Sequence, residues 1–95
     1  MEQGWVACST FNMACWAMWA ELVATGEEAL AQIGANTSTS PAGKYFIALV
    51  EPWPGQSGFF RSLEVYHAVL VNGVWMKGEA VNPMPRSIQY AGQEA

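Results

Sequence analysis

The chain has 95 residues, of which 52% are hydrophobic and 13% are charged, and its net charge is −4. This length fits a single domain over residues 1–95, and the acidic balance removes the counterion-release term that drives nucleic-acid binding. No apolar run is long enough to span a bilayer and the Met1–Gln3 start has no basic region, so we expect a cytoplasmic protein that binds neither nucleic acid nor membrane. The hydrophobic share exceeds what one small core can bury, so we expect a homo-oligomer such as a homodimer, or a protein partner on exposed apolar surface.

The first predicted element covers residues 12–24, which are nearly all compatible with a helix. Apolar side chains recur there at three- and four-residue steps, as they do in a largely buried helix. Ser9, Thr10 and Asn12 are all suitable N-caps. If Asn12 is the cap, Cys15 lies in the first turn, where the positive end of the helix dipole favours a thiolate.

A second, shorter helix is predicted directly after the first. Thr25 and Glu28 have the spacing of a capping box, so this helix should run to about Ile33 and stop at Gly34. Residues 35–44 are polar and turn-forming, and we expect them to link the helical half of the domain to a β half.

The second half of the chain predicts strands. Tyr45–Glu51 is rich in β-branched and aromatic residues, and Leu63–Val71 alternates between its two faces. Asn72-Gly73 predicts a type I′ hairpin turn, with Val74–Val81 returning as the antiparallel partner. Asn82-Pro83 should end that strand.

Together these elements predict an α+β fold, in which an N-terminal helix or helix pair packs on a three- to four-stranded antiparallel sheet. The tail after Pro85 is weakly patterned and predicts no element.

Three residues have the types and the order of a thiol nucleophile, its base and the group that orients the base, namely Cys15, His67 and Asn82. Cys15-Trp16-Ala17 resembles the nucleophile helix of the papain-like cysteine peptidase superfamily, and His67-Ala68-Val69 its His-Ala-Val strand. Asn82-Pro83 is most similar to the Asp-Pro of the bacteriocin-processing, C39-like branch. The resemblance implies a minimal papain-like core and a hydrolase or acyl transferase acting on a peptide or amide bond. Ser9 stands where that family places its oxyanion-hole glutamine.

The register of the hairpin decides whether this triad can form. A tight Asn72-Gly73 turn pairs His67 with Gly78 and leaves Asn82 four residues farther along the strand. The triad therefore needs a longer loop or a bulge, or else Glu79 as the orienting group in place of Asn82.

Each of the three residues also has an ordinary structural interpretation. Cys15 fits a small buried apolar residue, His67 a core histidine bonded to a backbone carbonyl, and Asn82 a turn residue after a strand. The competing hypothesis is a non-catalytic small inhibitor, for example a phage or mobile-element anti-defence protein that covers a host protein surface. We expect no cofactor and no metal, because the chain has neither a glycine-rich phosphate loop nor a Cys-x-x-Cys or His-x-x-x-His pattern.

Overall fold

The computed structural model describes residues 3–11, 14–17, 21–37, 45–55 and 58–90. This part of the chain is mostly β-structure, with one helix. In chain order its elements are β1 (Gly4–Phe11), β2 (Ala14–Ala17), α1 (Gly26–Thr37), β3 (Tyr45–Pro52), β4 (Phe59–Val71), β5 (Val74–Ala80) and β6 (Ser87–Tyr90).

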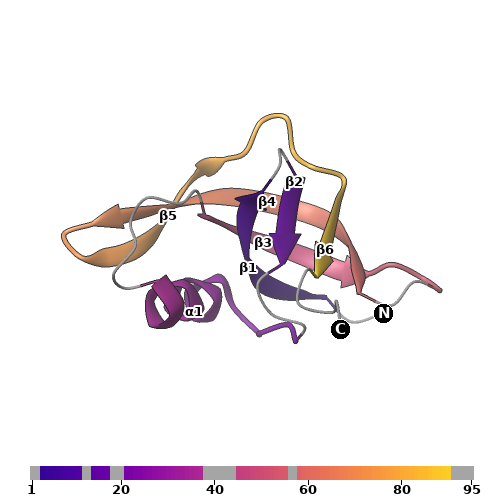
Figure 1. The fold of residues 1–95 in the computed structure, drawn as a ribbon, viewed down its shortest axis with the longest axis horizontal. Helices are drawn as coiled ribbons and strands as arrows, with labels where there is room; N and C mark the ends of the chain where they lie inside the picture. The colour runs from indigo at the N-terminus through magenta and orange to yellow at the C-terminus, as the bar shows by residue number, and fades with distance from the viewer. Residues whose placement is uncertain (1–2, 12–13, 18–20, 38–44, 56–57, 91–95) are drawn as a thin grey trace.

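Five of the strands close into a barrel. The strand order is β3-β1-β2-β6-β4-β5, and β3 also pairs with β4, which closes the ring. β2 and β6 run parallel, whereas the other neighbours are antiparallel. Among the described residues β5 pairs with β4 alone, so the β4–β5 hairpin extends beyond the barrel (Figure 1).

The barrel interior is filled by side chains from every strand of the ring. Val6 and Cys8 alternate with outward residues along β1, as the two-residue period of a strand requires, and both are fully buried. The buried residues of this interior cluster are Val6, Cys8, Ala17, Phe46, Ala48, Val50, Phe60, Val65 and Ile88.

Helix α1 covers part of the outer wall of the barrel. Ala29 and Ile33 on the helix pack against Ala7 of β1 and Ile47 of β3, and all four are fully buried. Figure 1 shows α1 beneath the strands, on the side toward which the hairpin extends. The helix therefore forms a second small core outside the barrel.

Two aromatic contacts lie beside this second core. The rings of Trp5 and Tyr66 stack with centroids 6.2 Å apart, and those of Tyr45 and Trp75 meet edge to face at 5.4 Å. Trp75 comes from β5, so this contact ties the hairpin to the helix-covered side of the barrel.

The start of α1 confirms the predicted capping residues. The Glu28 backbone N–H donates to Thr25 Oγ1 at 3.2 Å, and Glu28 Oε1 accepts from the Ala24 N–H at 3.0 Å. The helix continues through Gly34 to Thr37, so the predicted end is wrong by one turn.

The predicted α+β fold is wrong, and so is the papain-like core. In place of the expected helix over residues 12–24, Ala14–Ala17 is a strand between β1 and β6. Residues 12–13 and 18–20 lie outside the described part. The helical pattern gave a wrong prediction because pairing between strands overrides weak local helix propensity. Here β2 pairs with β1 on one side and β6 on the other, and a reading of residues 12–24 alone contains neither partner.

The second half of the chain agrees better with the sequence. β3 confirms the strand predicted over Tyr45–Glu51, and the β4–β5 hairpin confirms the predicted turn. β4 begins at Phe59, four residues before the expected start, and β6 has no counterpart in the sequence prediction. Within the described ranges, no helix has the length and apolar character needed to cross a membrane.

Candidate protein-interaction site

The structure does not bring the backbones of Cys15 and His67 close together. Cys15 pairs with Thr10 of β1, and β3 lies between β1 and the β4 strand that carries His67. Three strand spacings separate the two residues along this side of the barrel, which corresponds to about 14 Å along the sheet. A nucleophile and its base must lie within or near hydrogen-bond reach, so this arrangement lends no support to the proposed pair.

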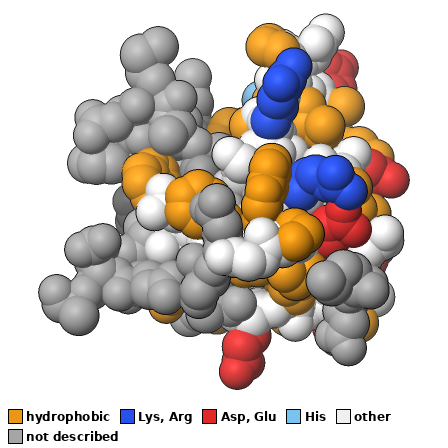
Figure 2. All heavy atoms as spheres, turned by 90° about the vertical axis from the view of Figure 1, so that its right-hand side faces the viewer, with side chains coloured by type: hydrophobic (Ala, Val, Ile, Leu, Met, Phe, Trp, Pro, Cys, Tyr) orange, Lys and Arg blue, Asp and Glu red, His pale blue; other side chains and the backbone are white. Residues whose placement is uncertain are grey.

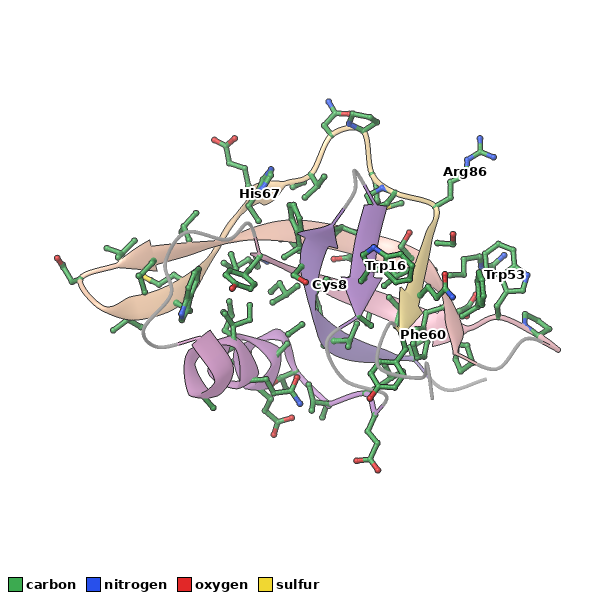
Figure 3. The ribbon with its side chains drawn as sticks, in the orientation of Figure 1. Cys8, Trp16, Trp53, Phe60, His67 and Arg86 are labelled. Atoms are coloured by element: carbon green, nitrogen blue, oxygen red, sulfur yellow. The ribbon has the colours of Figure 1, made fainter. Side chains whose placement is uncertain are left out.

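His67 is exposed, and its ring faces the Phe46 ring at a centroid distance of 5.2 Å. It is therefore not the buried core histidine that the ordinary interpretation of this position assumes. Cys8, the other cysteine, lies two strands from His67 and is fully buried, with Sγ 3.7 Å from the Val6 carbonyl oxygen. Figure 3 shows Cys8 among the barrel strands and His67 near the base of the hairpin.

Of the two residues expected to orient His67, the structure places Asn82 away from it and Glu79 opposite it. The Val81 N–H donates to the Val65 carbonyl, so the chain leaves the β4 ladder two residues, about 7 Å, from His67, and Asn82 follows in the bend beyond. A bulge in β5 at this point of the hairpin sets Gly78 and Glu79 opposite His67.

Ser9, expected in the oxyanion hole, pairs with Trp16 and so occupies the register position next to that of Cys15. Of the predicted site residues, the described strands place two pairs side by side, Ser9 with Cys15 and His67 with Glu79, the alternative orienting group.

The β4–β5 hairpin is the most distinctive surface feature of the molecule. Val71 pairs with Val74, and the turn residues Asn72 and Gly73 have φ angles of 52° and 80°, as a type I′ turn requires. Residues 69–76 include no charged side chain, although the chain as a whole has a net charge of −4. The tip of the hairpin is therefore a neutral, apolar projection.

One face of this hairpin carries an exposed apolar patch. Paired residues lie on the same face of a ladder, so Val69 with Met76 and Val71 with Val74 form two adjacent rows. Their exposed fractions are 41%, 48%, 44% and 58%, respectively. We call these four residues the hairpin face. The expectation that apolar side chains remain exposed is thus confirmed, although the sequence did not locate them.

The opposite face of the hairpin is turned toward α1 and is partly covered. Lys77 Nζ lies 4.1 Å from the centroid of the Tyr66 ring, and the Tyr66 hydroxyl donates to Glu64 Oε1 at 2.6 Å. This hydrogen bond, with desolvation and the negative charge of Glu64, raises the pKa of Tyr66 above its ordinary value.

An open groove runs between α1 and the tip of the hairpin. Its volume is about 380 Å³, and it is widely open to solvent. Its lining residues are Glu27, Leu30, Ala31, Gly34, Gly73, Val74 and Trp75.

The end of the molecule away from the hairpin tip carries charged side chains. Arg61 Nε donates to Glu51 Oε2 at 2.8 Å, and Arg86 projects at the same end (Figure 3). Figure 2 shows this end, where basic and acidic side chains lie directly beside hydrophobic ones. Charge is thus interspersed there and missing from the hairpin tip.

Within the described part of the chain, no three His, Cys, Asp or Glu side chains group where they could hold a metal ion. Comparison of the chain with protein-family models, with curated proteins and with solved structures gave no match.

Proposed function

We propose that this chain is a non-catalytic protein-binding module, and that its hairpin face associates with the same face of a second copy. The observation that carries the proposal is the gathering of four exposed apolar side chains on one face of a projecting, uncharged hairpin. Contiguous apolar patches of this kind usually mark interaction sites.

The hairpin face carries no charge that would oppose its pairing with a second copy. Two molecules of net charge −4 repel each other over most of their surfaces, but residues 69–76 carry no charge. The hairpin face can therefore meet its own symmetry mate without opposed like charges. Two-fold pairing also brings the same patch together from both copies, which is the commonest arrangement of homodimers.

The exposed area indicates that this association is weak. The four exposed fractions together equal about two fully exposed side chains, whose burial contributes about 3–6 kcal/mol per copy. A symmetric dimer doubles this to about 6–12 kcal/mol, which is comparable to the ~4–15 kcal/mol cost of association. With an association cost at the low end of that range, near ~4 kcal/mol, a gain of about 8–12 kcal/mol leaves about 4–8 kcal/mol, which corresponds to dissociation constants from millimolar to micromolar.

Thiol-dependent hydrolysis remains a prediction of the sequence. The separation of Cys15 from His67 along the sheet gives it no geometric support. The exposed hairpin face favours the binding function instead.

Sedimentation velocity over a concentration series tests the proposal. We expect the weight-average sedimentation coefficient of the wild-type chain to rise with concentration. The double variant Val71→Ser, Met76→Ser removes about one exposed side-chain equivalent from each copy, so the dimer should weaken by roughly a hundredfold or more.

Met84→Ser is the matched control, because Met84 is 40% exposed and lies outside the hairpin. It should associate like the wild type. A wild-type chain that stays monomeric at millimolar concentration, or equal weakening by Met84→Ser, would overturn the proposal.

A further inference from the structure

The groove between α1 and the hairpin tip shares only Val74 with the hairpin face and is a second candidate site. One helical stripe lines a wall of the groove, since Leu30 and Ala31 lie three and four residues after Glu27, and Gly34 lies four and three residues after them. Gly73, Val74 and Trp75 form the other wall. The groove is therefore bounded by one face of a helix and the end of an edge strand.

The edge of β5 beside this groove offers backbone hydrogen-bonding groups. Residues that flank a two-residue hairpin turn bond to each other, so Val74 and Met76 direct their backbone groups toward β4. Trp75 and Lys77 then direct theirs to the outer edge, which no described strand occupies. The bulge at Gly78 and Glu79 limits this open edge to a short stretch.

A strand added at this edge would send alternate side chains toward α1. Residues paired with Trp75 and Lys77 share their face, and that is the face on which Trp75 lines the groove. Gly34 leaves space on this face of the helix beside Trp75. A Cβ atom at position 34 would make an ordinary contact with Trp75 Cδ1 at 3.5 Å, whereas a larger side chain would fill the space.

The negative charge of Glu27 favours an added peptide strand that carries a basic side chain. Glu27 is exposed and lines one end of the groove, and in the described part of the chain no side chain neutralises it. Glu28, its neighbour, instead accepts a hydrogen bond from the Ala24 N–H at the start of the helix. A basic side chain in the occupant would therefore find an unpaired carboxylate.

We propose that this groove binds an extended peptide segment of a partner protein, with apolar side chains near Gly34 and Trp75 and a lysine or arginine near Glu27. Seven residues of helix separate Glu27 from Gly34, about 10 Å, which roughly three extended residues span. The peptide adds as a strand to the β5 edge, a recurring mode of peptide recognition. This binding does not depend on the association through the hairpin face.

Two fluorescein-labelled peptides test the groove by fluorescence anisotropy. They are Thr-Val-Thr-Val-Thr-Val-Thr-Lys-Thr and its twin with glutamate in place of lysine. The wild-type chain should bind the lysine peptide roughly tenfold more tightly than the glutamate peptide at low salt. Glu27→Lys should reverse this preference. Glu79→Lys makes the same change in net charge beyond the bulge, and it should keep the wild-type preference.

A second pair of variants tests the apolar end of the groove. Gly34→Leu favours the helix and fills the space beside Trp75, so it should abolish binding of both peptides. Gly34→Ala makes only an ordinary contact with Trp75 and should bind like the wild type.

The groove proposal is overturned if the wild type binds neither peptide, if it shows no preference, or if Glu79→Lys reverses the preference as Glu27→Lys does. Equal binding by Gly34→Leu and the wild type also overturns it. The hairpin-face variant Val71→Ser, Met76→Ser should bind the peptides normally. Failure of the groove and failure of the self-association are thus distinguished.

Discussion

Ile33 anchors α1 to the barrel, and its truncation measures how firmly the helix is held. The side chain is fully buried with Ala7, Ala29 and Ile47 in the core between helix and barrel. Ile33→Ala removes three carbon groups at about 0.8 kcal/mol each and leaves a cavity, so the free energy of unfolding should fall by about 3–4 kcal/mol. Ile33→Val, which removes one group, should cost about 1 kcal/mol.

Urea denaturation followed by tryptophan fluorescence gives these differences, at micromolar concentration so that self-association does not contribute. The Ile33→Ala chain should remain folded, since small domains have stabilities of about 5–15 kcal/mol, but its melting temperature should drop by roughly 15–25 °C. The denaturant slope should not change. A loss below about 1 kcal/mol for Ile33→Ala would show that α1 is not packed on the barrel as described.

Three further predictions concern single positions. Gly73→Ala should destabilise the hairpin by about 1 kcal/mol in the same denaturation assay, because φ is 80° there and alanine disfavours that region. In a spectrophotometric titration the Tyr66 phenol should ionise above its ordinary pKa, and Glu64→Gln should lower that pKa. Because the pKa is raised on folding, this contribution to stability is present below the unfolded-state pKa and is lost as pH rises through the folded-state pKa. Cys15→Ala should leave both sedimentation and peptide binding unchanged, and loss of either in a folded variant would count against a non-catalytic module.

The hairpin could be predicted from the sequence because its determinants are local. Asn72-Gly73 supplies two adjacent residues that tolerate positive φ, and the flanking runs alternate at the period of a strand. The cap of α1 was predictable for the same reason, since Thr25 and Glu28 satisfy backbone donors within one turn.

The barrel could not be predicted in this way because its closure depends on distant pairings. β2 lies between β1 and β6, and Trp16 pairs with Gln89 from the other end of the chain. Taken alone, Ala14–Ala17 contains good helix formers, so the local pattern favoured a helix that the long-range ladder overrides.

The sequence predicted that apolar side chains would be exposed, but not which face of the hairpin would carry them. The excess of hydrophobic residues predicted an exposed apolar patch, and the run from Val69 to Met76 is apolar on both sides of its turn. Which face stays exposed depends on where α1 packs, and that position is fixed by contacts of Ile33 with the barrel. The order of Cys15, His67 and Asn82 could be read directly, but their separation follows from the strand order.

Dilution of the chain followed by methyl NMR tests the central claim most directly. With valine and methionine methyl groups labelled, dilution from millimolar to micromolar concentration should shift the signals of Val69, Val71, Val74 and Met76, whose side chains form the hairpin face. The signals of Met84 and of buried Val6 should stay in place. Signals of the hairpin face that do not move on dilution, or shifts centred on Met84, would contradict association through this face.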